Sequence, residues 1–165
     1  MRCPVLRGDR VCLRQWRAEE AEDYVDGRDD EVFRWTTERR DLTAAQAAQG
    51  FSHYDGVDGV YPFAIVEHAT DRPVGNLPVT VQGDRAEIAY WLAPDARGRG
   101  LLAEASALVL SWLRSTGVAL AELEIHPGNE ASIRAAKRAG FTPAGRRTSP
   151  AFDETDVLVY QHLLG

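Results

Sequence analysis

The chain has 165 residues, of which 44% are hydrophobic and 27% are charged, and its net charge is −6 at pH 7. This length predicts a single domain over residues 1–165 with a substantial core, and the acidic balance argues against bulk attraction to nucleic acid. No apolar run is long enough to span a membrane, and Met1-Arg2-Cys3-Pro4 opens no signal-peptide pattern.

The first part of the chain predicts one strand followed by three helical segments. Val11 and Leu13, at alternate positions, indicate a strand over residues 11–16. The helical segments are predicted over residues 18–25, 29–35 and 44–52, with Gly27 ending the first and Thr43 capping the last. The acidic run from Glu19 to Glu31 is interpreted as a solvated face, with attraction of a cationic acceptor as the alternative.

The rest of the chain predicts an antiparallel meander, then a long helix, and then strands on either side of a second helix. The meander strands are residues 63–67, 74–81 and 86–92, the long helix is 101–113, and the next strand is 120–125. Asn129 is expected to cap a helix over 130–139 that ends at Gly140. Closing strands over 141–145 and 156–163 are expected on either side of a loop over 147–155. The order indicates an α+β fold with a mixed sheet, in which strands 86–92 and 120–125 are parallel.

A basic, glycine-containing turn separates strand 86–92 from the long helix. It reads Arg97-Gly98-Arg99-Gly100, and glycines allow close approach of the backbone to a ligand. A strand, such a turn and a helix start together aim unpaired backbone N–H groups at an anion. We interpret the turn as a pyrophosphate cradle, and the alternative is a basic surface turn.

Four stretches, in this order, resemble the GNAT superfamily of acetyl-CoA-dependent N-acetyltransferases, in the branch that acetylates the N-termini of ribosomal proteins. These are residues 11–16, residues 30–35, residues 86–92 running into Arg97-Gly98-Arg99-Gly100, and residues 129–134 ending in Arg138-Ala139-Gly140-Phe141. The resemblance covers nearly the whole chain. It implies a GNAT fold with a mixed, mostly antiparallel sheet of about seven strands and about four helices. Leu102 departs from the family's phosphate motif, which has glycine or alanine there.

The resemblance also implies which residues contact acetyl-CoA. The cofactor-binding positions it implies are Tyr90, Trp91, Leu92, Arg97, Gly98, Arg99, Gly100, Leu101, Leu102, Ala103, Asn129, Ser132 and Arg138. Backbone groups of Tyr90 to Leu92 are expected to bind the pantetheine arm, which Asn129 also bonds. The N–H groups from Gly98 to Ala103 are expected to hold the pyrophosphate, and Ser132 lies beside the thioester.

Direct acyl transfer needs an unprotonated amine, a polarised carbonyl and a proton for the leaving thiolate. Glu87 is the candidate base, directly or through water, because it shares a strand face with Ala89 and Trp91 that borders the expected acceptor groove. The alternative is a solvated strand glutamate. The family's helix tyrosine is replaced by Ala136, so Ser132 is the candidate acid. A serine that bonds the helix backbone, with water as the acid, is the alternative.

Other residue types point to no second chemistry. The four histidines have no metal-ligand spacing, and no metal is expected. The glycine turn also lacks the third glycine of a dinucleotide fingerprint. Trp16 and Trp35 are assigned to core packing, although they and the tyrosines Tyr54 and Tyr61 are also candidates for walls of the acceptor pocket.

The sequence therefore predicts a cytoplasmic acetyltransferase that moves an acetyl group from acetyl-CoA to a primary amine. The acceptor is a protein or peptide N-terminus or a small-molecule amine, and the chain is a monomer or homodimer. The alternative is an acyl-CoA-binding module with little or no turnover. Cys3 and Cys12 have no metal or redox spacing and favour a reducing compartment, with a disulfide between them as the minority interpretation.

Overall fold

A computed structural model describes residues 3–165. Met1 and Arg2, which open the segment considered for a signal peptide, lie outside the described residues. The helices are α1 (Ala21–Asp26), α2 (Asp30–Trp35), α3 (Ala44–His53), α4 (Leu101–Ser115) and α5 (Glu130–Arg138). The strands are β1 (Leu6–Arg7), β2 (Val11–Gln15), β3 (Val60–Glu67), β4 (Arg72–Gln82), β5 (Arg85–Ile88), β6 (Trp91–Leu92), β7 (Leu120–Ile125), β8 (Thr142–Ser149) and β9 (Thr155–Leu163).

The strands form one mixed sheet with the order β1-β2-β3-β4-β5-β7-β9-β8, and β6 pairs with β4 beyond the end of β5. The expected antiparallel meander is confirmed for β3, β4 and β5, and β5 pairs in parallel with β7 as predicted. The described strands number nine rather than about seven, and the described α-helices five rather than about four. The two additional strands come from the short β1 and from the division of the predicted strand 86–92 into β5 and β6. The five described helices correspond to the segments that the local patterns predict, one more than the family resemblance implies.

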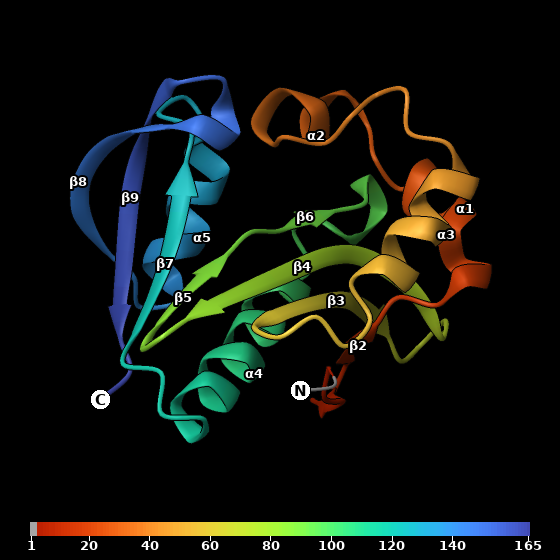
Figure 1. The fold of residues 1–165 in the computed structure, drawn as a ribbon, viewed down its shortest axis with the longest axis horizontal. Coiled ribbons are helices and arrows are strands. Elements are labelled where there is room, and N and C mark those ends of the chain that lie inside the picture. The colour runs from red at the N-terminus through yellow and green to blue at the C-terminus, as the bar shows by residue number, and fades with distance from the viewer. Residues whose placement is uncertain (1–2) are drawn as a thin grey trace.

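The parallel contact between β5 and β7 is short, and the sheet opens beyond it. Pairing covers only Arg85–Glu87 against Leu120–Glu122, after which β6 continues beside β4 while β7 turns toward β9. Figure 1 shows the two halves of the sheet diverging from this point, with α2 facing the top of β7 and β9.

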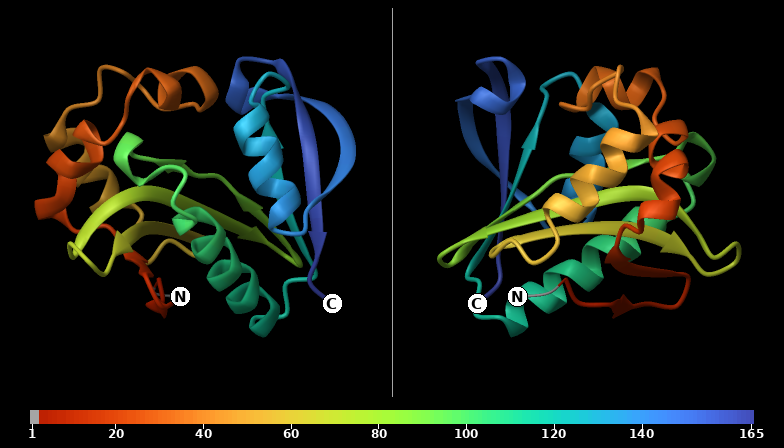
Figure 2. Two further views of the ribbon diagram at one scale, coloured as in Figure 1. Left: turned by 180° about the vertical axis from the view of Figure 1, so that it is seen from behind. Right: turned by 45° about the vertical axis from the view of Figure 1, so that its right-hand side comes forward.

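Helices cover both faces of the sheet, and the two faces hold different cores. The larger core lies under α4 and α5, where every third or fourth residue of α4 is buried as its periodicity predicts. Seen from behind, α4 and α5 lie over the sheet, and α1 and α3 lie on its other side (Figure 2). The second core, under α1 and α3, is aromatic and includes Trp16, Phe51 and Trp91. Trp16 is therefore a core residue, as predicted.

Local capping rules explain most helix boundaries. Thr43 and Gln46 form a capping box at α3, and the Asn129 side chain accepts a hydrogen bond from Ser132 N at 3.2 Å at the start of α5. Gly27 is the C-cap of α1. The helix expected over 18–25 begins as one 3-10 turn before α1. Cys3 and Cys12 are both free thiols, so the minority disulfide interpretation is wrong.

The last loop is shorter than predicted. The segment expected to be loop from residue 147 is strand as far as Ser149, because Arg147, Thr148 and Ser149 pair with Val157, Asp156 and Thr155. The pairing shifts register between Pro143 and Arg146, which hides the strand from a simple alternation pattern. This extension places Arg147 on the edge strand β8, from which its side chain reaches Glu122 and Glu124 of β7. No helix among residues 3–165 is long and apolar enough to cross a membrane.

Candidate active site

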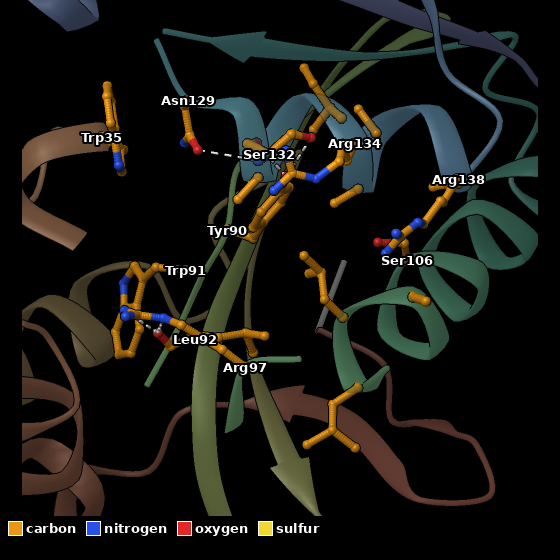
Figure 3. Close-up of a pocket in the computed structure, with 18 of the residues that line it drawn as sticks. Trp35, Tyr90, Trp91, Leu92, Arg97, Ser106, Asn129, Ser132, Arg134 and Arg138 are labelled. Carbon is orange, nitrogen blue, oxygen red and sulfur yellow. Dashed lines mark hydrogen bonds between the residues drawn. The ribbon is translucent and has the colours of Figure 1, made fainter. Parts of the chain in front are cut away.

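A cavity of about 690 Å³ opens where the sheet divides. Its walls are the β5–β6 segment, the start of α4, one side of α5 along its length and the inner side of α2 (Figure 3). Predicted site residues in the lining are Tyr90, Trp91, Leu92, Arg97, Gly98, Gly100, Leu101, Leu102, Ala103, Asn129, Ser132 and Arg138. The structure thus brings together nearly all residues that the sequence placed around the donor. Glu87 and Arg99 do not line this cavity.

The start of α4 presents free backbone donors to the cavity. Gly100 is its N-cap in a left-handed conformation (φ 78°) and provides no side chain to cap the helix. Gly98 is also left-handed, with φ 70°, a conformation that glycine adopts without strain. The first N–H groups of a helix have no intrahelical acceptor, so those of Leu101 to Ala103 remain available. Together with the helix dipole they favour an anion at this point.

The two arginines of the turn have protein partners. Arg97 forms a two-pronged pair with Asp29, with Nη1–Oδ2 at 2.9 Å and Nη2–Oδ1 at 2.7 Å, and also donates to the Leu92 carbonyl. Hydrogen bonds from Arg97 hold the pKa of Asp29 down at about 2. The Arg99 side chain turns away from the cavity to bond the buried Glu67. The side chains of the turn therefore brace its backbone, and Arg97 joins the start of α2 to it.

Arg10, which sequence reasoning missed, supports the turn from outside. Its Nη1 donates to the Arg99 carbonyl at 2.7 Å, and its Nε pairs with Glu104 at 3.2 Å. A Cβ added at Gly100 would lie 3.0 Å from Arg10 Nη2. A lone arginine in a loop after the short β1 gives no sequence signal for this role, because the contact spans 89 positions.

Free positive charge in the cavity comes from α5. Arg134 and Arg138 line the cavity one turn apart, and within residues 3–165 neither has an ion-pair or hydrogen-bond partner (Figure 3). Of these two arginines, the family resemblance implied only Arg138. The four-residue spacing of the two arginines was the signal that would have added Arg134, because such residues share a helix face.

Two hydroxyl groups meet in the wall between β5 and α5. The Tyr90 Oη and Ser132 Oγ atoms are hydrogen-bonded to each other, and Tyr90 Oη also lies 3.5 Å from the Ser132 carbonyl oxygen. Burial raises the pKa of the Tyr90 phenol, and the bond to Ser132 opposes that shift. The Ser132 hydroxyl is thus occupied by a side chain from the opposite wall, and not by the backbone near Asn129.

The far end of the cavity is closed by α2, and here the prediction for Trp35 was wrong. Its side chain lines the cavity instead of joining a core, with the ring 5.1 Å from that of His126 and packed against Gly128. Its Nε1 donates to Glu31 at 2.9 Å. Of the other two aromatic candidates, Tyr61 is in the larger core and Tyr54 is exposed outside this lining.

The acidic run from Glu19 to Glu31 is not one solvated face. Glu20 is buried and pairs with Arg14, while Asp29 pairs with Arg97 and Glu31 lines the cavity. The expectation of a uniform solvated face was wrong because each helix of the run packs differently. The acidic side chains of this run take part in several separate contacts.

Glu87 lies on the opposite face of the sheet from α4 and α5. Ala86 and Ile88 enter the larger core and Trp91 the aromatic one, so the predicted alternation of faces is confirmed. No hydrogen-bond partner is present for the Glu87 carboxylate in the described chain. Partial burial raises its pKa, and the charge of Glu124 raises it further. A carboxylate that is free of partners and less acidic than usual is suited to accept a proton.

Two more carboxylates, Glu122 and Glu124 on β7, lie on the face of Glu87, and we call these three residues the carboxylate face. The carboxylates of Glu122 and Glu124 both accept hydrogen bonds from other side chains. Arg147 donates to Glu122 at 2.9 Å and to Glu124 at 2.6 Å, reaching across β9 from β8. Burial alone raises the pKa of Glu122, but hydrogen bonds from Gln161, Arg85 and Arg147 outweigh it and hold that pKa below its ordinary value. The sequence offered no sign of this network, because it joins four strands, β5, β7, β8 and β9.

No group of three or more His, Cys, Asp or Glu side chains between residues 3 and 165 is arranged to hold a metal ion. The described geometry instead combines a long cavity, open backbone donors at one end, free cationic side chains and an unpaired carboxylate on the far side of the sheet. The fold and cavity define an α+β protein of the GNAT architecture, with an open, divided sheet.

The sequence matches the family described as an acetyltransferase (GNAT) domain over residues 10–142, and the chain belongs to this acetyltransferase family. A comparison with curated proteins finds no significant match. Among solved structures, an acetyltransferase of the GNAT family from Bacillus anthracis is similar over 98% of this chain and 99% of its own, with a TM-score of 0.83 and 18% identity.

Two further structures have the same fold. The ribosomal-protein-S5-alanine acetyltransferase from Vibrio fischeri has a TM-score of 0.79 and 14% identity, and 97% of this chain and 96% of that chain are covered. AAC(6')-Ib in complex with Parmomycin and AcetylCoA has a TM-score of 0.78 and 19% identity, with 94% of each chain covered. At these identities the likeness concerns the fold.

Proposed function

We propose that this chain, acting as one domain over residues 1–165, transfers an acetyl group from acetyl-CoA to a primary amine by direct attack of the amine. The observation that carries the proposal is the uncapped start of α4, where Gly100 leaves the N–H groups of Leu101 to Ala103 open to a cavity of about 690 Å³. A diphosphate fits such a helix start without any lysine or arginine beside it. Acetyl-CoA supplies the acyl thioester.

The cavity residues divide the donor between them. The start of α4 would hold the diphosphate, while Arg134 and Arg138 face the cavity with charge that no carboxylate among residues 3–165 pairs with. Backbone groups of Tyr90 to Leu92 that point away from β4, where pairing with β7 has ended, would bond the amide groups of the pantetheine arm, but the Leu92 carbonyl already accepts from Arg97. The Asn129 side chain already caps α5 through Ser132 N, so its amide nitrogen is the group left for the arm.

The amine would approach from the carboxylate face and meet the donor where β5 and β7 part. Glu87 accepts the proton that the attacking amine loses, directly or through water. An α-amine, with a pKa of about 7.7–8.0, needs less help from one carboxylate than a lysine amine at about 10.4. We therefore expect an acceptor that presents a low-pKa primary amine, such as a peptide N-terminus or an amino group on a small molecule.

The similar solved structures also guide the choice of acceptors to test. One similar structure is a ribosomal-protein acetyltransferase and another is bound to Parmomycin. Peptide N-termini and small amines should therefore be screened together, with acetyl-CoA present, for a mass increase of one acetyl group. A single class of modified acceptors would support the proposal and name the substrate.

The second candidate is a CoA-binding module without useful turnover. Leu102 and Ala136, which depart from the family pattern, are the observations that favour it. Calorimetric titration with acetyl-CoA, paired with measurement of thiol release across the panel, separates the two. Binding together with acceptor-dependent thiol release is expected. Tight binding without such release would identify the module, and absence of binding would overturn both.

A further inference from the structure

Tyr90 and Ser132 approach each other from two facing elements of the cavity. Tyr90 lies in the irregular segment between β5 and β6, and Ser132 lies in the first turn of α5. Both residues line the cavity, and their hydroxyl oxygens are within hydrogen-bond reach of each other. Figure 3 shows the tyrosine directed toward the start of α5. The contact bridges two elements that no strand pairing joins at this level.

Each partner is held in place before any ligand arrives. Ser132 is fixed by its N–H bond to Asn129 Oδ1 at 3.2 Å. The segment that carries Tyr90 is tied to β4 on both sides, through Ala89 N to the Pro78 carbonyl at 3.1 Å and through β6. The Tyr90 ring also packs against the larger core. The geometry of the pair is therefore set by the fold.

Two hydroxyls bonded to each other have one proton left over. Each hydroxyl carries one proton, and one of the two is used in the bond between them. Tyr90 Oη lies close to both the hydroxyl and the carbonyl oxygen of Ser132, which are two acceptors, so the phenol is placed to donate to Ser132. The proton of Ser132 is then the one that faces the cavity. On α5 no other residue has a hydroxyl group.

Building on the proposed acetyl transfer, we propose that Tyr90 is a positioning residue that aims the Ser132 hydroxyl at the thioester sulfur of the donor, which leaves as a thiolate when the acyl–sulfur bond breaks. By donating to Ser132 Oγ, Tyr90 removes the rotational freedom of that hydroxyl and strengthens it as a donor, because hydrogen bonds in a chain polarise one another. The pair stabilises negative charge on the sulfur. In the resting protein the phenol stays protonated, as its raised pKa requires.

This arrangement changes a property of the bound coenzyme that can be measured without turnover. A hydrogen bond to the charged form of a group lowers its pKa. Coenzyme A labelled with ¹³C next to sulfur should therefore show, by NMR titration on the wild-type protein, a thiol that ionises at lower pH than on Tyr90→Phe. We expect a difference of about one pH unit, a tenfold change in the thiolate ratio.

Controls separate a hydroxyl effect from a loss of structure. Tyr61→Phe removes a hydroxyl from a tyrosine of the larger core outside the cavity lining and should leave the titration unchanged. Ser132→Ala removes the donor itself and should raise the thiol pKa at least as much as Tyr90→Phe. Because Tyr90 acts through Ser132, the double variant Tyr90→Phe/Ser132→Ala should have the same thiol pKa as Ser132→Ala. The turnover of Ser132→Ala should be about tenfold below that of the wild type, and that of the double variant should be the same.

The outcomes are distinct. If coenzyme A does not bind the wild-type protein, the proposed function and this inference both fail. If it binds and Tyr90→Phe titrates like the wild type, only the role of Tyr90 fails. If Tyr90→Phe does not fold, Ser132→Ala decides alone, because an unchanged thiol pKa in that variant overturns the assignment. Additive losses in the double variant would also overturn it, since Tyr90 would then act independently.

Discussion

The glycine turn at the start of α4 and the carboxylate face on the other side of the sheet are built in different ways. The turn, residues 97–100, comes from one short stretch and leads into backbone N–H donors, although side chains distant in sequence, such as Arg10 and Asp29, brace it. The carboxylate face takes Glu87 from β5 and Glu122 and Glu124 from β7, and Arg147 on β8 holds the last two. One site is local and made of main chain, and the other is long-range and made of charges.

The comparison shows which parts of the protein tolerate change. Backbone donors remain when a side chain is replaced, so the turn should accept Leu102 in place of the usual small residue. Buried charges depend on each other, because removing one leaves its partner unpaired in a poorly solvated place. We therefore expect variants of the turn to act on ligand binding and variants of the carboxylate face to act on catalysis or stability.

The largest effect is expected from Gly100→Glu. The new Cβ would lie 3.0 Å from Arg10 Nη2, so the side chain should displace Arg10 from the Arg99 carbonyl and add negative charge beside the open N–H groups. The affinity for acetyl-CoA should therefore fall by about 100-fold or more, as loss of charged hydrogen bonds implies. Calorimetric titration with acetyl-CoA measures this affinity. Gly117→Glu is the matched control, because Gly117 also has a positive φ (86°) but lies at the other end of α4 in open space. Equal affinity in the two variants would remove the turn from the donor site.

Glu87→Gln should act on turnover alone. We expect kcat at pH 7 to fall by about 100-fold, the scale of general-base catalysis, with the affinity for acetyl-CoA nearly unchanged. The loss should be greatest at low pH, below about pH 8, where an α-amine arrives protonated. In the wild type, activity should itself decline as pH falls through the raised pKa of Glu87. Glu22→Gln, at an exposed position of α1, is the control, and a matching loss of donor affinity in Glu87→Gln would make Glu87 structural.

Arg147→Met tests whether the paired carboxylates depend on one cation. Glu122 and Glu124 have side chains only 7% and 10% exposed, and Arg147 bonds both. Urea unfolding should show a loss of about 2 kcal/mol, less than for a fully buried pair because Arg147 is itself partly exposed. Adding Glu124→Gln should restore part of it. Arg146→Met, at the exposed neighbouring position, should change the free energy of unfolding little. An equal loss in that variant would mean that the stability depends on the packing of β8 and not on the charge of Arg147.

The smallest effect is expected at the ion pair between Asp29 and Arg97, which joins the start of α2 to the glycine turn. Asp29→Asn keeps a good N-cap but removes the charge, and should cost about 1 kcal/mol because the pair is one-third exposed. The lowered pKa of Asp29, about 2, means that its stabilisation is present above about pH 3.9 and is lost as pH falls toward 2. Urea titrations of both proteins should therefore converge across that range, and a constant difference would rule out the ion pair.

Predictions from local pattern were accurate where neighbours in sequence decide the outcome. The caps at Thr43 and Asn129, the C-cap at Gly27 and the apolar stripe of α4 all follow from residues within a few positions of each other. The same holds for the glycine turn, whose left-handed glycines lie between a strand and a helix. Prediction failed at β8, because its register shift breaks the alternation, and at Trp35, because its neighbours in space come from residues 126–128.

The sequence by itself determined the α+β order, the parallel step between β5 and β7, and the turn at the mouth of α4, since each depends on short-range periodicity, caps and glycine conformations. Only the tertiary structure decided the partners of the charges. It paired Arg97 with Asp29 and Arg147 with two glutamates, left Glu87 alone, and brought Tyr90 to Ser132. The physical reason is that electrostatic and hydrogen-bond contacts act over a few ångströms in space, and strand register and helix docking decide which distant residues come that close.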